Sequence, residues 1–249
     1  MGAASPAELV RAAADAGFDG VGLRLYRSPG LTYAFTPLAG NPALMREVRT
    51  ALADRGLEVF EVLSYYLQPD MDWDGIKASL EAAAELGGKY PLVIGDDPDW
   101  ARMCASLARL CDMCEPLGLQ AAIEAPVYSR VTNTFPICTQ LIADTGHPNA
   151  VLGLDPFMFG RRGHSVDLLR AVDQRLLPYS QFGDGLLESG VRTAPGKGEA
   201  PLADILGALP ADAPLSLEWG APRDQSYSPA EWAKVAYRET HAFLDNQSS

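Results

Sequence analysis

The sequence has no run of basic residues, only three histidines and no long apolar stretch. Its 32 acidic residues outnumber its 20 basic residues, which gives a formal net charge of -12 at pH 7. A surface of this sign repels nucleic acid and anionic lipid headgroups. No apolar run reaches the roughly 18 residues that a membrane span needs, and the N-terminus lacks a basic stretch followed by an apolar one. We therefore predict a cytoplasmic protein with neither a nucleic-acid nor a membrane partner.

Motifs typical of nucleotide enzymes are also missing, and cysteine is scarce. The segment APGKGE lacks the spacing of a P-loop, and no G-x-G-x-x-G follows a predicted strand. Four cysteines in 249 residues do not suggest a disulfide framework. Cys104, Cys111 and Cys114 fall at helical spacing, and the pair Cys111 and Cys114 has no second cysteine or histidine pair at zinc spacing. We expect these three cysteines to pack within one helix.

What the sequence does contain is enough apolar material for a large core. With 47% hydrophobic and 21% charged residues, it is typical of a globular protein, and 249 residues fit one α/β barrel. Short apolar runs alternate with helix-like segments throughout. Such strands, joined by helices, indicate a parallel sheet covered on both faces, as in a doubly wound sheet or a (β/α)8 barrel. We predict a single domain over residues 1–249.

The predicted strands and helices alternate from the first helix onward. Ser5, Pro6 and Glu8 form a capping box with proline at the first helical position, which fixes the start of that helix. The predicted strands are 18–25, 57–67, 90–96, 119–125, 150–155, 176–184 and 214–220, and the predicted helices are 5–16, 41–55, 73–86, 98–116, 133–144, 165–173, 201–208 and 228–244. A complete barrel needs one more strand before the first helix, so we expect that strand to be missing or trimmed. The alternative is a seven-stranded barrel or an open sheet.

Four polar residues end successive apolar strands: Glu124, Asp155, Gln181 and Glu218. In a parallel barrel these ends converge at one mouth, where function concentrates. Three carboxylates brought together there would repel one another unless a cation held them. Oxygen ligands favour Mg²⁺ or Mn²⁺, and the lack of histidine in the set makes zinc less natural. The alternative is that each acid caps the following helix or pairs with a loop arginine.

An ordered set of motifs resembles the xylose isomerase-like TIM barrel superfamily, the sugar phosphate isomerase/epimerase group. The motifs are AADAGFDGVGLRL, GLQAAIEAP, NAVLGLDP, YSQFGDG followed by RTAPGKGEAPLADIL, and LSLEWG, and they span about residues 5–245. The resemblance implies a (β/α)8 TIM barrel that begins with a strand ahead of the first helix. It also implies that Glu124, Asp155, Gln181 and Glu218 hold one divalent metal ion, Mn²⁺ or Mg²⁺, with Co²⁺ and Zn²⁺ as alternatives.

The activity implied is that of an isomerase or epimerase acting on a sugar, a sugar phosphate or a cyclic polyol ketone. Glu124 and Glu218 would remove and return protons through an enediolate. Return on the other face gives an epimer, return to the neighbouring carbon gives an isomer, and loss of a β-hydroxyl gives a dehydratase. The residues do not choose among these outcomes, nor between a homo-oligomer and a hetero-oligomer.

Two positions depart from the family pattern. Gln181 stands where epimerases of the family usually have histidine, and glutamine occurs there in members that resemble 3-dehydroshikimate dehydratases. Met158 stands where many relatives have a histidine, and its thioether cannot shuttle a proton. Of the three histidines, only His164 lies where it could substitute. A metal-dependent dehydratase or lyase, and a non-catalytic binding or assembly subunit, are therefore the alternatives.

Six further residues are predicted to contact or orient the substrate. Arg192 matches a family arginine that orients substrate oxygens, Arg161 follows Asp155 closely enough to reach the mouth, and Asp184 is expected to orient Gln181 or Arg192. Arg24, Tyr65 and Trp219 lie at strand ends and could line the pocket, although aromatic residues there often pack under a loop. The expected partner is a small polyhydroxy ketone or sugar.

Overall fold

The computed structural model describes residues 4–27, 36–221 and 226–247. The chain divides into two compact units, each made of more than one segment. The first unit comprises Met1–Tyr65, Asp72–Pro91 and Gly220–Ser249, and the second comprises Tyr66–Met71 and Leu92–Trp219. Strands β2 (Glu58–Leu67) and β3 (Tyr90–Gly95) each pass from one unit into the other.

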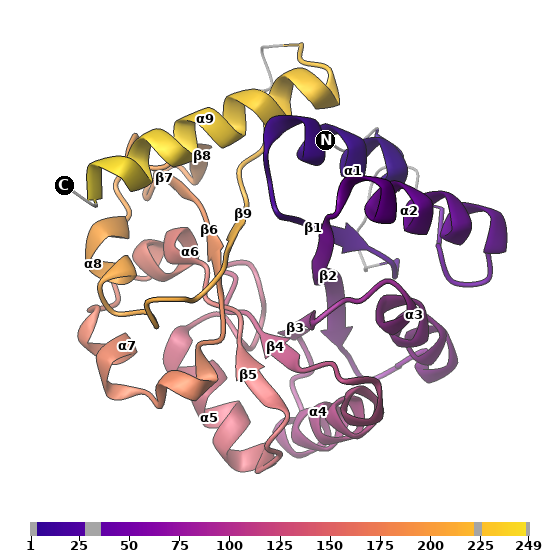
Figure 1. Ribbon diagram of the computed structural model, residues 1–249. Coiled ribbons are helices and arrows are strands. Elements are labelled where there is room, and N and C mark those ends of the chain that lie inside the picture. The colour runs from indigo at the N-terminus through magenta and orange to yellow at the C-terminus, as the bar shows by residue number, and fades with distance from the viewer. Residues whose placement is uncertain (1–3, 28–35, 222–225, 248–249) are drawn as a thin grey trace. The chain divides into compact units, whose positions relative to one another are not determined.

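In the first unit, helices pack around a parallel strand pair. Its further elements are α1 (Pro6–Ala16), β1 (Gly20–Arg24), α2 (Pro42–Arg55), α3 (Trp73–Glu85) and α9 (Pro229–Gln247). Strand β1 pairs in parallel with β2. Helix α1 lies beside both α2 and α9, although α9 follows it by more than 200 residues (Figure 1). The predicted capping box is confirmed, because Ser5 and Glu8 bond reciprocally through side chain and backbone and Gly17 ends α1 in the left-handed region.

The second unit carries a continuous run of parallel strands. Its further elements are α4 (Trp100–Cys114), η1 (Glu115–Leu117), β4 (Ala121–Ile123), α5 (Phe135–Thr145), β5 (Ala150–Leu152), α6 (Pro156–Arg161), α7 (Asp167–Ala171), η2 (Gln174–Leu176), β6 (Ser180–Phe182), β7 (Asp184–Leu186), β8 (Val191–Thr193), α8 (Leu202–Leu206) and β9 (Leu215–Leu217). Strand β3 pairs with β4 and β4 with β5, a bridge from Leu154 to Ser180 leads to β6, and β6 pairs with β9. The carboxyl ends of these strands therefore lie along one edge.

Two features of the second unit were not predicted. Helix α6 begins at Pro156 directly after Asp155, an N-cap followed by proline at the first helical position, which is a recognisable start signal. Strands β7 and β8 form an antiparallel hairpin that begins at the end of the predicted strand 176–184 and ends before the predicted helix 201–208. The predicted strand 176–184 is correspondingly shorter, since β6 covers only Ser180–Phe182.

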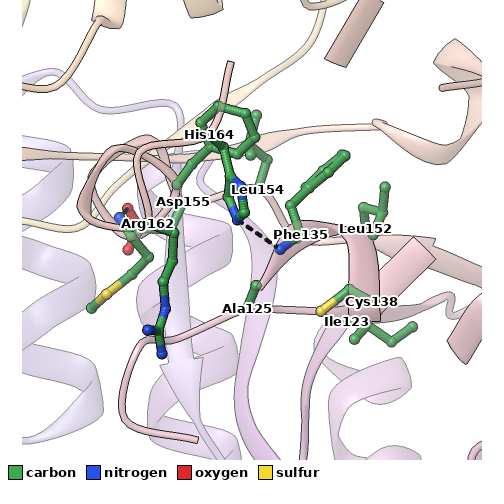
Figure 2. Close-up of a pocket in the computed structure, with 12 residues that line it drawn as sticks. Ile123, Ala125, Phe135, Cys138, Leu152, Leu154, Asp155, Arg162 and His164 are labelled. Carbon is green, nitrogen blue, oxygen red and sulfur yellow. Dashed lines mark hydrogen bonds between the residues drawn. The ribbon is translucent and has the colours of Figure 1, made fainter. Parts of the chain in front are cut away.

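The start of α5 depends on a histidine from another segment. Thr134 is the N-cap residue but makes no side-chain capping bond. Instead, Nε2 of His164 accepts a hydrogen bond of 3.3 Å from the Phe135 N–H group (Figure 2). Burial, followed by the charge of Arg162, lowers the pKa of His164, which favours the neutral imidazole that this bond needs.

The cysteines behave as the sequence predicts. Cys111 and Cys114 of α4 are fully buried, and all four cysteines are free. Burial raises the pKa of Cys111 to about 12, so its thiol stays protonated. None of the described helices combines the length and the apolar character required to cross a bilayer.

Asp97 links the end of β3 to α4, and it gives the fold a testable pH dependence. Its buried carboxylate accepts hydrogen bonds of 2.6 and 2.7 Å from Arg102, which lower its pKa against the effect of burial. A carboxyl group with a lowered pKa stabilises the fold above its unfolded pKa and loses this contribution as pH falls through the folded pKa. Since Arg102 is half-exposed, Asp97→Asn should lower the free energy of unfolding by about 1 kcal/mol at pH 7.

Urea unfolding at several pH values checks this expectation. The difference between wild type and Asp97→Asn should shrink as pH falls below about 4. The exposed Asp212 supplies the control variant, Asp212→Asn, which should differ little from wild type at any pH. A difference for Asp97→Asn that is the same at pH 7 and pH 3 would contradict the role assigned to the ion pair.

Candidate functional site

The four predicted strand-end residues lie on neighbouring strands of the second unit. Glu124 directly follows β4, and its N–H donates to Val93 O at 2.9 Å. Glu218 directly follows β9, and its N–H donates to Phe182 O at 2.9 Å. Asp155 follows the bridge residue Leu154, and Gln181 lies on β6, the strand between those that lead to Asp155 and Glu218.

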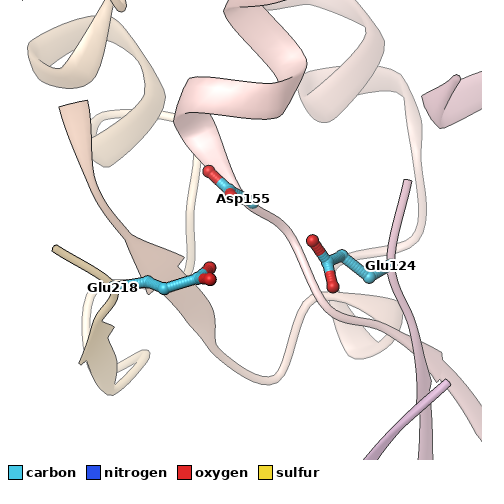
Figure 3. Close-up of side chains that lie close together, drawn as sticks. All are labelled: Glu124, Asp155 and Glu218. Carbon is cyan, nitrogen blue, oxygen red and sulfur yellow. The ribbon is translucent and has the colours of Figure 1, made fainter. Parts of the chain in front are cut away.

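Three of these residues bring their carboxylates together. One oxygen each of Glu124, Asp155 and Glu218 lies within 4.8 Å of the others. Glu124 and Glu218 point toward one another from opposite sides, and Asp155 points into the same space (Figure 3). Glu124 and Asp155 are each only 4% exposed. Like charges at such a distance repel by roughly 3–4 kcal/mol at an effective dielectric constant of about 20, so the cluster needs positive charge.

Arg192 of β8 supplies part of that charge. Its Nη2 lies 2.6 Å from Asp155 Oδ2 and 3.2 Å from Glu218 Oε2, and its Nη1 donates to Glu218 O at 2.9 Å. Burial alone would lower the pKa of Arg192, but the charges of Asp155, Glu218 and Glu124 outweigh it and raise the pKa. One guanidinium against three carboxylates leaves these four groups with a formal charge of −2.

The close approach of Arg192 to Glu218 requires glycine at position 183. A Cβ atom there would lie 2.6 Å from Arg192 Nη1 and 2.7 Å from Glu218 O. Any side chain would therefore force the guanidinium away from the cluster.

Asp184 holds the hairpin that presents Arg192. Its fully buried carboxylate accepts four backbone hydrogen bonds of 2.7 to 3.0 Å, and the donors are Gly185, Gly196, Gly198 and Ala200. The carboxylate thus ties the start of β7 to the segment after β8. These four hydrogen bonds of Asp184 go to the backbone of this segment and not to the side chains of Gln181 or Arg192, which it was predicted to orient.

Arg161 also braces the hairpin. Its Nε donates to Leu187 O at 3.1 Å, between β7 and β8. Its guanidinium lies 5.8 Å from the centre of the Phe157 ring, and that of Arg192 lies 5.0 Å from the same centre. Phe157 of α6 therefore supports both arginines through its negatively charged ring face.

Asp155 makes the structural contacts that were the alternative to metal binding, and it can still act as a metal ligand. Its Oδ1 accepts from the N–H groups of Phe157 and Met158 and caps α6, while Oδ2 faces Arg192. Helix capping and pairing with a loop arginine are therefore both present at this residue. Oδ1 accepts two hydrogen bonds and Oδ2 one, so a lone pair of Oδ2 still allows the carboxylate to bind a cation.

The environment of Gln181 shows whether the side chains of the site suit a bound metal ion. Its Oε1 is buried and accepts no hydrogen bond from any described residue. Such an acceptor costs about 1–3 kcal/mol when left unsatisfied. A divalent cation would satisfy this oxygen and neutralise the formal charge of −2 on the neighbouring groups. The chemistry of this donor set, carboxylate and amide oxygens, fits a hard or borderline divalent ion.

Histidine does not contribute to the cluster. Met158, which replaces the histidine of many relatives, is buried, and with Asp155 and His164 it lines a small, mostly apolar pocket. His164 is already engaged at the start of α5, so it does not supply the missing proton-transfer group.

Three further residues were predicted to contact the substrate: Tyr65, Arg24 and Trp219. Tyr65 in the first unit is fully buried, its hydroxyl bonded to Ser79 at 2.7 Å and its ring stacked on Tyr26. Arg24, half-buried, ends β1 of the same unit. Trp219 follows Glu218 and is half-buried. The prediction that these three contact substrate stays a prediction.

Comparison with known proteins identifies the family. The family model described as xylose isomerase-like TIM barrel matches residues 10–247. The chain belongs to this family. The resemblance noted in the sequence and the expected α/β TIM-barrel fold are thereby confirmed.

Two solved structures support the fold of this xylose isomerase-like protein. A xylose isomerase domain protein from Alicyclobacillus acidocaldarius is 17% identical, with a TM-score of 0.75 over 99% of this chain and 95% of the other. The IolI protein with a bound zinc atom is 18% identical, with a TM-score of 0.72 over 96% of this chain and 91% of the other.

One curated relative is similar in sequence over part of the chain. Inosose isomerase of Bacillus subtilis (strain 168) is 29% identical over 148 residues, which are 53% of this chain and 53% of that protein. The similarity therefore spans about half the length of the curated relative.

The Arg192 ion pairs predict how stability depends on a bound cation. Arg192→Met should lower the free energy of unfolding of the metal-free protein by about 2 kcal/mol, because it leaves the carboxylates without their counter-charge. Mn²⁺ should then stabilise the variant more than it stabilises wild type. Thermal unfolding with EDTA and with Mn²⁺ checks both expectations.

The control for Arg192 is an exposed ion pair. Arg175→Met breaks the pair with Asp173, in which Arg175 is 90% exposed, and should change stability by less than about 1 kcal/mol with either addition. Equal stabilisation of wild type and Arg192→Met by Mn²⁺ would show that Arg192 and a cation do not neutralise the same charges.

For Gln181 we expect effects opposite to those of Arg192→Met: a metal-free protein that is not destabilised, and weaker binding of Mn²⁺. Gln181→Met removes a buried acceptor that lacks a donor, so the metal-free protein should be as stable as wild type or more stable. Its affinity for Mn²⁺ should fall at least about tenfold, because an oxygen ligand is lost. Calorimetric titration with Mn²⁺ and unfolding in EDTA measure the two quantities. Unchanged Mn²⁺ affinity would remove Gln181 from the ligand set.

Proposed function

We propose that the chain is a divalent-metal-dependent isomerase or epimerase that acts on a polyhydroxy ketone. The observation that carries the proposal is the cluster of Glu124, Asp155 and Glu218, together with a buried Gln181 oxygen on the neighbouring strand β6 that accepts no hydrogen bond from the described residues. Such groups are costly to bury together unless a cation binds them.

Relatives of the chain support the type of reaction. The curated relative is named inosose isomerase, and solved structures of the same fold include a D-allulose 3-epimerase from a Methylomonas species and an L-ribulose 3-epimerase, at 16% and 23% identity. The structure with a bound zinc atom shows that a metal occurs on this fold. For this chain we leave the metal open, with Mn²⁺ or Mg²⁺ favoured by the ligand set.

Glu124, Asp155, Gln181 and Glu218 would hold the ion. When bound, a divalent ion would polarise the carbonyl and hydroxyl oxygens of a hydroxy ketone and so acidify the hydroxyl-bearing carbon next to the carbonyl. The protein's own groups must then move the proton. Glu124 and Glu218 approach from opposite sides, so one can remove a proton from one face and the other can return it to the opposite face.

The different exposure of the two glutamates gives them different tasks. Glu124 is buried, whereas the Glu218 side chain is 50% exposed. Glu218 can therefore exchange its proton with solvent directly, whereas Glu124 would release the proton that it takes from the substrate only after the product leaves. Arg192, held against Glu218 and Asp155, is placed to donate a hydrogen bond to a substrate oxygen.

A dehydratase is the second candidate, and Gln181 favours it. The glutamine is the residue found in family members that resemble 3-dehydroshikimate dehydratases, and it is buried with an unsatisfied oxygen as a ligand would be. The same proton removal followed by loss of a β-hydroxyl would give this outcome.

Exchange of a carbon-bound proton with solvent tests the proposal. The Mn²⁺-loaded protein in D₂O should exchange the proton next to the carbonyl of an inosose, a ketohexose or 3-dehydroshikimate, observed by proton NMR. Glu124→Gln and Glu218→Gln should each reduce the exchange rate at least about a hundredfold, the size of a general acid–base contribution. Loss of a β-hydroxyl would be seen in the same spectra and would identify the dehydratase.

The matched control is Glu115→Gln, which changes an exposed glutamate at the end of α4. It should exchange at the wild-type rate. Absence of exchange on all three compounds with Mn²⁺, Mg²⁺, Co²⁺ or Zn²⁺ present would refute the proposed function.

A further inference from the structure

An exposed aromatic side chain stands on the loop that follows Glu124. Tyr128 is 62% exposed, more than Val191, Leu186 or Tyr227, the other exposed large apolar residues among those described. A single exposed ring needs no explanation by itself. What distinguishes Tyr128 is how firmly its loop is held and where its hydroxyl lies.

The end of β3 fixes the loop on one side. Ser129 Oγ donates to Gly95 O at 2.8 Å, and the Thr132 N–H donates to the same oxygen at 3.0 Å. The Gly95 N–H in turn donates to Thr132 Oγ1 at 2.9 Å. These groups are buried, so the bonds form away from competing water.

Arginines fix the loop on its other sides. Arg162, which ends α6, donates to Val127 O at 2.9 Å and to Asn133 O at 2.7 Å. Arg130 binds the carboxylate of Asp96 through its backbone N–H, Nε and Nη2. The carbonyl group just before Tyr128 and the hydroxyl group just after it are therefore both bonded.

The hydroxyl of Tyr128 is close enough to Glu124 and Glu218 to be affected by their negative charge. It shares a hydrogen bond with Tyr66, which belongs to the same unit. Burial of the hydroxyl raises the pKa of Tyr128, and the negative charges of Glu124 and Glu218 raise it further. The residue as a whole is 62% exposed, so much of its surface is open to solvent.

We propose that Tyr128 is a specificity-determining residue, whose rigid ring is a platform for the C–H face of an uncharged cyclic polyol ketone. The inference rests on the proposed function and names its substrate class. A ring held in place before binding loses little side-chain entropy when a ligand covers it. Its negatively charged face attracts the C–H groups that a cyclic polyol presents together on one side.

The residues around Tyr128 favour an uncharged cyclic ligand over a phosphorylated ligand or an open-chain ketone. Arg130 and Arg162, the arginines that border Tyr128, already bind Asp96 and backbone carbonyls, so neither offers its guanidinium fork to a phosphate. An open-chain ketone would have to order several rotatable bonds to present the same C–H surface, whereas a ring presents it already formed.

Steady-state kinetics with two ketones test the proposal. The cyclic substrate is 2-keto-myo-inositol, and the comparison is erythrulose, which is too short to form a stable ring. Tyr128→Ala should raise KM for the cyclic ketone about tenfold while changing kcat less than about threefold. KM for erythrulose should stay within about threefold of wild type. Tyr128→Phe, which keeps the ring, should restore most of the affinity for the cyclic ketone.

Tyr227→Ala is the control for loss of an exposed tyrosine elsewhere, and circular dichroism checks that each variant is folded. An unchanged KM for the cyclic ketone in Tyr128→Ala, or an equal rise for both ketones, would overturn the proposal. A fall in kcat alone would also overturn it, because a platform acts on binding.

Binding of an unreactive ring separates this proposal from the proposed function. Saturation-transfer NMR with myo-inositol, which lacks a carbonyl group, needs no turnover. If wild type exchanges neither ketone, the proposed function fails, and the binding signal decides on Tyr128. Signals from wild type and Tyr128→Phe but not Tyr128→Ala would support the platform. Equal signals from all three proteins, or none from any, would refute it.

Discussion

Repulsion among three carboxylates is the constraint on which the second unit depends. Glu124, Asp155 and Glu218 lie on strands that are separated in sequence, yet one oxygen of each comes within 4.8 Å of the others. Because two of them are nearly fully buried, water cannot screen this repulsion. Arg192 compensates only part of the charge, which leaves the cluster suited to a divalent cation.

The position of Arg192 in turn explains the structure around it. Asp184 uses its whole carboxylate on backbone N–H groups, so the segment from β7 to α8 folds back in one defined way. Gly183 leaves the space that the guanidinium needs, and the Phe157 ring of α6 packs against it with its centre 5.0 Å away. A hairpin that looks like an ordinary surface loop in the sequence is therefore the device that delivers one positive charge to a buried site.

The strands and the acids at their carboxyl ends could be predicted from the sequence because each signal is local. An apolar run that ends in Glu124, Asp155 or Glu218 shows both the strand and the acid at its carboxyl end. The hairpin could not be predicted, since its register depends on Asp184 and Arg161 bonding to distant backbone groups. Tyr128 was missed for the same reason: its loop is fixed by Gly95, Asp96 and Arg162, none of which is close in sequence.

The absence of histidine among the groups that meet at the described cluster bears on how a proton would be handled there. His164 is the histidine of the second unit that comes nearest to a suitable position in sequence, but its Nε2 accepts a backbone hydrogen bond and its lowered pKa keeps it neutral. Met158 has no proton to give. In the proposed reaction both transfers therefore fall to Glu124 and Glu218, and the arginines around them orient rather than titrate. In the proposed reaction the substrate would then be selected through shape and stacking, which is the role proposed for Tyr128 on the loop that follows Glu124.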